Sequence, residues 1–325
     1  MPEPARPLRI LVAGAGSFGR EHLSRLANCT GVVVAGIADT NAATLDLART
    51  RYGIANCRTD ALAMISDTPA DAVVVATPAA SHVELAATAL ARNLCVLLEK
   101  PIAPSAAEAN RLWDAARASS GFVLPGHVLR FSADHARLVA IVASGEIGEV
   151  LYVNSRRYRG DDHAQRYADT DPVLMTLIHD IDLAQWITGS DFRSVLARRS
   201  AGVGFRSMTA ASVTTANGVI CDLRTAWTHP TGDLPPDRLE VVGDRGSVEL
   251  VEGRSLEAYR KGRRIVDDPT TADDPLGNEH DHFLACAADR SRARRLGLDE
   301  ALAGLRLADA IFASLRQGRE VSVPI

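Results

Sequence analysis

The feature that most constrains this fold is a glycine-rich turn near the N-terminus, residues 14–19, with the sequence GAGSFG. A strand-like apolar run, Leu8–Ala13, directly precedes the turn, and a helical stretch follows it. Asp39 comes twenty residues after Gly19, at the end of a second apolar run, Val32–Ala38. This order is typical of a βαβ unit that binds a dinucleotide. The alternative interpretation is a simple glycine turn with Asp39 as an N-cap.

The chemistry of this unit favours NAD over NADP. The glycines permit a tight turn and a close approach of the backbone to a pyrophosphate at a helix N-terminus. Asp39 would accept hydrogen bonds from the adenosine ribose, and Thr40 and Asn41 follow it without an adjacent Arg to bind a 2′-phosphate. The expected cofactor contacts are Gly14, Gly16, Ser17, Phe18, Gly19 and Asp39.

The pattern of apolar residues predicts two domains, consistent with a length of 325 residues. Up to residue 125, short apolar runs such as 72–76 (AVVVA) and 95–98 (CVLL) alternate with amphipathic stretches, which indicates a doubly wound parallel sheet. Capping boxes are expected at Ser81 with Glu84 and at Ser105 with Glu108. We expect a Rossmann domain at 1–125 and a second domain at 126–325.

The second domain combines helical and strand-like segments. Helices are expected at 133–144, 171–187, 277–290 and 299–317, a strand at 150–159, and further strands after residue 193. Asp171 is the expected N-cap of the second helix, with Pro172 at its first position. The acidic segment 267–278 is expected to form a loop.

Composition excludes several classes of protein. A net charge of -4 is not the basic footprint of a nucleic-acid-binding protein. No apolar run approaches the ~18 residues of a membrane span, and the N-terminus does not resemble a signal peptide. The five widely spaced cysteines contain no CxxC pair, which favours reduced thiols over disulfides or zinc. We expect a cytoplasmic protein without a metal, nucleic-acid or membrane partner.

Only two of the 36 basic residues are Lys, and the other 34 are Arg. Codon usage accounts for such a ratio, but Lys can shift its pKa and handle a proton where Arg cannot. Lys100 follows the 95–98 run, at the sheet edge where ligands bind. The alternative is a solvated Lys at the end of a strand. Lys261, within RKGRR, is expected to be an exchangeable turn residue.

Met175, His179, Asp182 and Trp186 are spaced by four, three and four residues, so they share one face of the expected helix. His179 is a candidate general base that Asp182 would orient; the alternative is a buried core histidine. His127 and Arg130 lie where the two domains should meet, and Arg130 would bind either substrate hydroxyls or the other domain. Tyr158, Trp227 and His229 are candidates for the wall of a pocket.

These segments together resemble the Gfo/Idh/MocA family of NAD(P)-dependent oxidoreductases, nearly from end to end. The matching segments are GAGSFG at 14–19, Thr77-Pro78 with His82, Glu99-Lys100-Pro101, GHVLRF at 126–131, GEIGEV at 145–150, IHDID at 178–182 and GDRGSV at 243–248. The order and spacing of the motifs carry the resemblance, since each motif alone is modest.

The resemblance implies an α/β Rossmann domain followed by an α+β domain with a large, open, mostly antiparallel sheet. The open face of that sheet would form a homodimer or homotetramer. The activity would be hydride transfer between NAD and a secondary alcohol or hemiacetal carbon of a sugar, cyclitol or related polyol. The Lys100–Pro101 peptide is expected to be cis.

The resemblance also assigns residues to roles. The expected catalytic residues are Lys100 and His179. Further cofactor contacts are expected from Thr77, Pro78, His82, Glu99, Lys100 and Pro101. Candidates for substrate contact are His127, Arg130, Tyr158, Tyr167 and Met175.

Met175 departs from the family pattern, because many members carry an Asp one turn before the His. Either His179 acts alone or it receives help from the preceding loop, in which Asp161, Asp162, His163 and Tyr167 are candidates. Two further hypotheses therefore remain: an NAD-dependent glycosidase that uses transient oxidation, and a non-catalytic sensor of a sugar or nucleotide.

Overall fold

The computed structural model describes residues 6–167, 169–202, 206–232, 234–260, 262–268 and 273–324. Contacts divide the chain into two compact units, one of residues 1–126 with 276–302 and one of residues 127–275 with 303–325. The sequence predicted a single boundary, after residue 125. It did not predict that residues 276–302 also belong to the first unit. Residues 276–302 return to the first unit, where the ring of Phe283 packs edge-on against Phe122 at 6.0 Å.

The first unit is a six-stranded parallel sheet in the order β3-β2-β1-β4-β5-β6. Its strands are β1 (Leu8–Ala13), β2 (Val32–Ala38), β3 (Cys57–Arg58), β4 (Ala72–Val75), β5 (Cys95–Glu99) and β6 (Val123–Gly126). Its helices are α1 (Ser17–Leu26), α2 (Ala42–Tyr52), α3 (Ala61–Asp67), η1 (Ala79–Ser81), α4 (His82–Ala91), α5 (Ala106–Arg117) and α9 (Pro275–Ala288). This strand order is that of a dinucleotide-binding fold.

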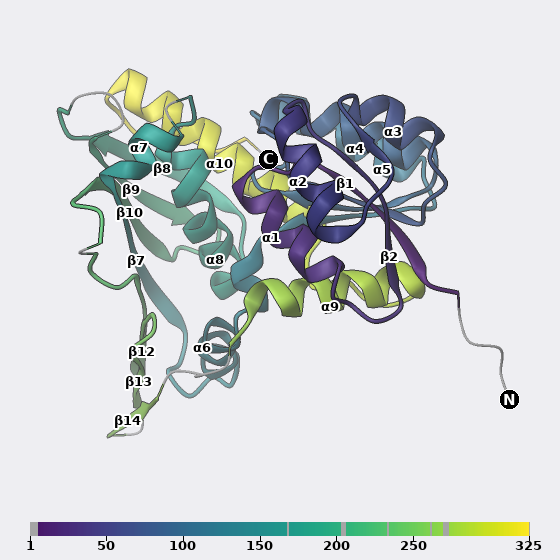
Figure 1. The fold of residues 1–325 in the computed structure, drawn as a ribbon. Coiled ribbons are helices and arrows are strands. Elements are labelled where there is room, and N and C mark those ends of the chain that lie inside the picture. Colours follow the sequence, from purple (N-terminus) through teal and green to yellow (C-terminus); the bar gives the residue numbers. More distant parts are fainter. Residues whose placement is uncertain are drawn as a thin grey trace, which may run out of the picture. The chain divides into compact units, whose positions relative to one another are not determined.

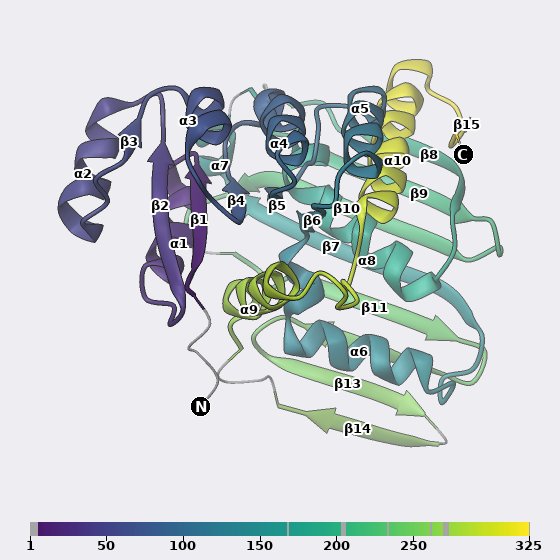
Figure 2. The ribbon, with the colours of Figure 1, turned by 90° about the vertical axis from the view of Figure 1, so that its right-hand side faces the viewer.

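Helices cover both faces of this sheet. Helices α3, α4 and α5 stand in a row over one face, and α1 and α9 lie on the other (Figures 1 and 2). All four residues of β4 are completely buried, as expected for a strand that is covered on both sides. The register aligns Ala13 with Ala38 and Val75, and Val75 with Leu98, so the segments after β1, β2, β4 and β5 emerge at one edge.

The second unit is built on a nine-stranded sheet in the order β14-β13-β12-β11-β7-β10-β9-β8-β15, in which only the β7–β10 pair is parallel among the described residues. Its strands are β7 (Val150–Gly160), β8 (Phe192–Arg199), β9 (Met208–Thr215), β10 (Ile220–His229), β11 (Arg238–Gly243), β12 (Gly246–Val251), β13 (Ser255–Arg260), β14 (Arg263–Asp267) and β15 (Val321–Ser322). Its helices are η2 (Val128–Phe131), α6 (Ala133–Ala143), α7 (Asp161–Arg166), η3 (Val173–Leu177) and α8 (Ile178–Thr188). Helix α10 (Leu298–Gln317) begins in the first unit and continues in the second.

Helices α6, α8 and α10 pack on one face of this sheet (Figure 2). Strand β7 shows the consequence, because Val153, Ser155 and Arg157 are buried while Asn154 and Arg156 on the opposite face are half-buried. The two-residue period of a strand produces this alternation. The architecture expected from the sequence is thus confirmed in both units.

Three local predictions need correction. The helix expected at 171–187 opens with a wide π turn at η3, although Asp171 still accepts a hydrogen bond from the Val173 amide. The expected loop before it contains α7, whose first turn carries two acidic residues that suit a helix N-terminus. Residues 275–278 belong to α9, whose first residue is a proline, a favoured first helical position.

The two expected capping boxes have different outcomes. Ser105 Oγ accepts a hydrogen bond from the Glu108 amide. Ser81 does not cap α4, because its hydroxyl donates to the Pro78 carbonyl and lies 2.7 Å from the Thr77 hydroxyl. Lys261 lies outside the described residues.

Candidate functional site

The glycines of the GAGSFG turn are required by close backbone approaches. Gly14 has a φ of +92°, and a Cβ there would lie 2.4 Å from the Ala76 carbonyl oxygen at the end of β4. A Cβ on Gly19 would lie 2.2 Å from the Gly14 carbonyl oxygen. Gly16 differs, because no heavy atom lies within 4 Å of the Cβ position. The turn is therefore closed against the end of β4 at Gly14, closed against its own backbone at Gly19, and open at Gly16.

The N-terminus of α1 carries no side-chain cap among the described residues. In the same unit, Asn41, Asp60 and Ser105 cap α2, α3 and α5. An uncapped helix end presents backbone N–H groups and a positive dipole end, which suit a phosphate. Together with the space at Gly16, this arrangement fits the pyrophosphate of a dinucleotide.

Asp39 follows β2 and is held rigidly beside the turn. Its Oδ2 accepts a 2.7 Å hydrogen bond from the Ala15 amide, and its Oδ1 accepts one of 2.8 Å from the Asn41 amide. Each oxygen keeps a further lone pair, so the carboxylate can still accept hydrogen bonds from ribose hydroxyls.

A hollow of about 450 Å³ lies close by, lined by residues of α2, of β3 and of the segment after β3. Its two arginines are already paired with carboxylates. Arg49 lies 2.6 Å from Asp46, and Arg58 lies 2.8 Å from Asp67. A 2′-phosphate would have to compete with these carboxylates, which supports the preference for NAD.

His82 supports the loops that follow β4 and β5. Its ring is buried, with Nδ1 2.9 Å from the Pro101 carbonyl oxygen and Nε2 2.7 Å from that of Thr77. Burial lowers the pKa of His82 below its ordinary value, although both carbonyls oppose the shift. The structure thus gives His82 a role in joining the two loops, because its ring nitrogens face these carbonyls. The Lys100–Pro101 peptide in the second loop is cis, as expected.

Lys100 and Glu99 point to different surroundings at the end of β5. Lys100 is half-buried, whereas Glu99 is only 6% exposed. Glu99 Oε1 lies 2.8 Å from His22 Nε2, and Glu99 Oε2 accepts a 3.2 Å hydrogen bond from the Lys100 amide. Glu99 was expected to contact the cofactor, but its carboxylate is directed into the protein.

In the second unit, Asp182 pairs with Arg130. Arg130 donates to both carboxylate oxygens through Nε at 2.9 Å and Nη2 at 2.9 Å, and both residues are buried. His127 Nδ1 lies 3.9 Å from the same carboxylate. Asp182 is therefore the ion-pair partner of Arg130, and its proposed orientation of His179 stays a prediction.

The π turn of η3 precedes the half-buried His179, and it changes the helical spacing that was expected between Met175 and His179. Residues five apart are bonded in such a turn, so Met175 does not stand one regular α-turn before His179. Thr176 accepts a 2.9 Å hydrogen bond from the buried Trp227 indole. The ring of Tyr167 lies 6.4 Å from that of Trp227, so Tyr167 is held close to this turn.

The other proposed helpers of His179 lie on α7. Asp161 and Asp162 both accept hydrogen bonds from the Thr231 hydroxyl. The ring of His163 lies 5.8 Å from that of Trp227, and burial lowers the pKa of His163. Of the four candidates, His163 and Tyr167 are thus the two whose rings lie against Trp227, edge-on and tilted.

Tyr158 lies on the opposite face of β7 from α8. Strand alternation places it with Arg156, whose guanidinium carbon is 5.4 Å from the Tyr158 ring centre. Tyr158 also stacks on His229 at 5.1 Å. Ser155 and Arg157, on the other face, contact α8. The period of the strand therefore sends the Tyr158 ring to the face of β7 opposite α8, which carries His179, and a contact of Tyr158 with substrate stays a prediction.

The sequence did not reveal a buried network that holds α8 next to His179. Arg157 Nε donates a 3.2 Å hydrogen bond to Asp180, and its Nη1 donates one of 2.5 Å to Asp237. Ser155 donates a further bond to Asp180. Burial raises the pKa of Asp180, although Arg157 opposes the shift. The sequence does show an Asp, Asp180, directly after His179. Its partners could not be predicted, because they lie on strands that are distant in the sequence.

Several properties of the described residues bear on the remaining predictions. All five cysteines are free, as expected. No described helix is long and apolar enough to span a membrane. Within the same ranges, no group of three or more His, Cys, Asp or Glu side chains could hold a metal ion.

Two family models match this chain. The model described as "Oxidoreductase family, NAD-binding Rossmann fold" covers residues 8–127, and the "GFO/IDH/MocA C-terminal domain" covers residues 135–249. The first match includes the glycine turn, Asp39 and Lys100, and the second includes His179.

The chain is also similar to curated enzymes and to a solved structure. It is 31% identical to inositol 2-dehydrogenase of Acidothermus cellulolyticus over 77% of this chain and 75% of that protein. It is 32% identical to inositol 2-dehydrogenase of Salmonella paratyphi B over 58% of this chain, but spans only 56% of that protein's length. An Agrobacterium radiobacter oxidoreductase crystallised with NAD+, L-tartaric acid and magnesium has the same fold, with a TM-score of 0.88 and 20% identity over 97% of this chain and 98% of that one.

Proposed function

The chain belongs to the GFO/IDH/MocA oxidoreductase family, and from this premise we propose that it is an NAD-dependent dehydrogenase of a cyclitol, sugar or related polyol. The observation that carries the proposal is the NAD-binding unit with Lys100 at its carboxyl edge. The inositol 2-dehydrogenase relatives favour a cyclitol within this class.

The first unit would hold the cofactor through backbone and carboxylate groups. The GAGSFG turn and the uncapped end of α1 would bind the pyrophosphate, and Asp39 would bind the ribose. Bound NAD supplies the acceptor for a hydride. The proposed contacts are Gly14, Gly16, Ser17, Phe18, Gly19, Asp39, Thr77, Pro78, Lys100 and Pro101.

Lys100 and His179 would handle the proton of the reacting hydroxyl. His179, when neutral, takes the proton as general base. Lys100 donates a hydrogen bond to the same oxygen and stabilises the negative charge that develops there. In the reductive direction the two roles reverse. Because residue 175 is Met, His163 and Tyr167 are the groups we propose to assist His179.

The proposal is tested by incubating the protein with NAD and a panel of inositols, aldoses, sugar acids and glycosides while the absorbance of reduced nicotinamide and the release of free sugar are followed. Formation of NADH with one polyol class supports a dehydrogenase. Glycoside cleavage without net NADH would instead support the glycosidase. Binding of NAD and sugar with no turnover of any member would support a sensor.

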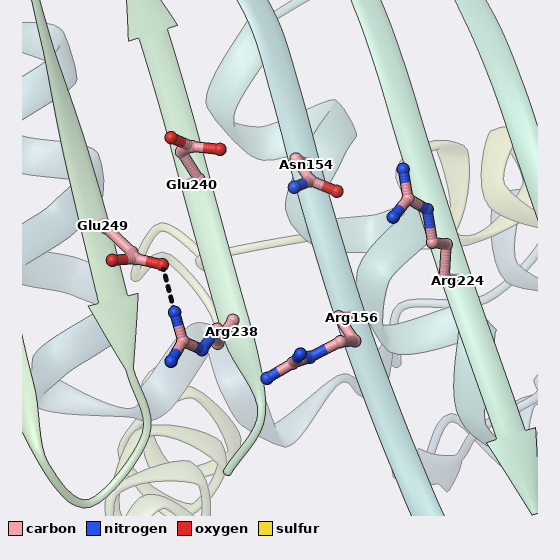
Figure 3. A pocket seen from close by; sticks show the side chains of 6 residues that line it. All are labelled: Asn154, Arg156, Arg224, Arg238, Glu240 and Glu249. Atoms are coloured by element: carbon pink, nitrogen blue, oxygen red, sulfur yellow. Dashed lines mark hydrogen bonds and ion pairs between the residues drawn. The ribbon is translucent and has the colours of Figure 1, made fainter. Parts of the chain in front are cut away.

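We further propose that the open face of the second sheet joins copies of this chain into a homodimer or homotetramer. Figure 3 shows guanidinium and carboxylate groups interspersed on β12, β11, β7 and β10, around a hollow of about 290 Å³. Arg156 and Arg224 share this face with Glu240, while Arg238 pairs with Glu249 at 3.1 Å. A symmetric contact suits such a surface, because each copy offers both signs of charge. The five free cysteines suit a reducing compartment such as the cytoplasm.

A further inference from the structure

A chain of buried side chains lies behind Lys100 in the first unit. His22 of α1 is fully buried, and its two ring nitrogens face different partners. Nε2 lies 2.8 Å from Glu99 Oε1, and Nδ1 lies 2.7 Å from His280 Nε2. Glu99 Oε2 in turn accepts the Lys100 amide hydrogen. The chain thus runs from α9, through α1, to the backbone of Lys100.

Three separate parts of the sequence supply this chain. His22 follows the glycine turn, Glu99 ends β5, and His280 comes from the segment that returns to this unit after the second sheet. The rings of His22 and His280 stack at 5.0 Å with an interplanar angle of 14°. The ring of Phe18 covers His22 from another side, edge-on at 5.0 Å.

The bonds of this chain can form with two different numbers of protons. If both rings are neutral, His22 donates to the Glu99 carboxylate through Nε2, and His280 donates to His22 Nδ1. If His22 holds an extra proton, it donates through both nitrogens, and His280 accepts. The added proton reverses one hydrogen bond without breaking any. A second added proton would place two N–H groups against each other.

Glu279 lies near this hydrogen-bonded chain of side chains, and the neutral form of its carboxyl group adds no negative charge there. It is completely buried, and its carboxyl oxygens have no hydrogen-bond partner among the described residues. Burial and, second, the nearby Glu99 raise its pKa well above the ordinary value. Two ionised carboxylates are strongly disfavoured in one buried site, so an ionised Glu99 favours the neutral form of Glu279. The other charged groups near Glu99 are the His82 ring, when protonated, and Lys100.

We propose that His280 completes a hydrogen-bonded chain with His22 and Glu99 that positions the backbone of Lys100 and keeps its bonds in both protonation states. His22, Glu99 and His280 are positioning residues in this proposal. The expected effect of this hydrogen-bonded chain on turnover rests on the proposed catalytic role of Lys100. The existence of the hydrogen bonds themselves does not depend on that role.

Nuclear magnetic resonance tests the bonds independently of turnover. In protein labelled with 15N, we expect scalar coupling between His22 Nδ1 and His280 Nε2 both below and above the ordinary histidine pKa of about 6.5. We expect His280→Phe to shift the Lys100 amide resonance and His280→Gln, whose amide can occupy the Nε2 position, to restore it. Absence of the coupling at either pH, or an unmoved Lys100 resonance in His280→Phe, would overturn the proposal.

Kinetics tests the consequence for the reaction. We expect His280→Phe to lower kcat by about tenfold with little change in the Kd for NAD, the size expected for losing one hydrogen bond to a charged group. His280→Gln should recover most of the loss. His282→Phe, two residues further along α9, is the matched control and should leave kcat near that of the parent protein.

The two proposals fail in different ways. If Lys100→Ala retains full turnover, the proposed catalytic role of Lys100 is wrong. The scalar coupling between the His22 and His280 rings then still tests whether the hydrogen-bonded chain of side chains exists. If the coupling is present but His280→Phe leaves kcat unchanged, the positioning of Lys100 by this chain is wrong, whatever Lys100 does. If His280→Phe does not fold, the spectra of the parent protein and of His280→Gln still test whether these hydrogen bonds are present.

Glu279 gives a separate check through stability. Because its pKa is higher in the folded than in the unfolded protein, it stabilises the fold fully below the unfolded pKa, and this contribution is lost as pH rises towards the folded pKa. The loss is about 1.4 kcal/mol per pH unit in that range. In urea unfolding, Glu279→Gln should therefore gain stability relative to the parent as pH rises. A constant difference across pH would show that Glu279 is ionised in the fold, contrary to the proposal.

Discussion

At the residue scale, Lys100 stands out by its rarity, by its position and by the contact of its backbone amide. It is one of two lysines among 36 basic residues, it follows a strand at the ligand-binding edge, and its amide is held by Glu99. Lys is a compact donor with a tunable pKa, whereas Arg is fixed in its charged form. These properties suit a group that meets a developing alkoxide.

We expect Lys100→Ala and His179→Ala each to lower kcat by roughly 10²-fold or more, because each removes a charge-stabilising or proton-accepting group from the reaction. The Kd for NAD should stay nearly unchanged. Steady-state kinetics on the substrate found in the panel, together with NAD titration, measures both quantities. Lys261→Ala, which removes the other lysine, is the matched control; unchanged turnover in Lys100→Ala would refute the assignment.

Asp39 is the residue at which we expect cofactor choice to be set. Asp39→Ala should weaken NAD binding by about tenfold and bring the Kd values of NAD and NADP closer together, because a carboxylate both binds the ribose hydroxyls and repels a 2′-phosphate. Calorimetric titration with each nucleotide measures the ratio. Asp39→Asn keeps the size and removes the charge, so a ratio like that of the parent in this variant would show that charge is not the cause.

At the scale of elements, the buried Arg130–Asp182 pair joins η2 to α8. Arg130→Leu and Asp182→Leu should each reduce the free energy of unfolding by about 3–5 kcal/mol, because each leaves an unpaired buried charge. The double variant should be less destabilised than the sum of the two single variants. Urea unfolding followed by circular dichroism measures these values.

The matched control for that cycle is the exposed pair of Arg49 and Asp46 on α2, which lies at 2.6 Å with side chains 51% and 71% exposed. Arg49→Leu should change stability by less than about 1 kcal/mol, because water screens exposed ion pairs. If both pairs contribute equally, burial is not what makes the Arg130–Asp182 pair important.

Helices and strands were predicted well where the pattern of apolar residues continues without interruption. The strands β1, β2 and β4 match the apolar runs closely, and for β4 the cause is burial on both faces, which leaves a continuous apolar signature. The π turn at Val173–Leu177 was not predictable, because its extra residue is stabilised by tertiary contacts such as the Trp227–Thr176 hydrogen bond. Helix α7 was missed because five of its six residues are polar and show no apolar period.

At the scale of the whole molecule, assembly depends on the open sheet face. We expect Arg156→Glu combined with Arg224→Glu to reduce the mass of the assembly, because it gives the face an excess of negative charge. Analytical ultracentrifugation at low and high salt measures the mass. Arg111→Glu, exposed on α5, is the matched control. An unchanged mass in the double variant would place the interface elsewhere.

The sequence by itself determined the nucleotide-binding unit, its NAD preference and the prominence of Lys100. These features depend on glycine conformation, strand period and neighbouring residues, all of which are local in the chain. Only the tertiary structure decided the partners of Asp182 and Glu99, the face on which Tyr158 lies, and the return of His280 to the first unit. The contacts of Asp182, Glu99 and His280 join residues 52 to 258 positions apart, and residue patterns do not encode which distant groups meet.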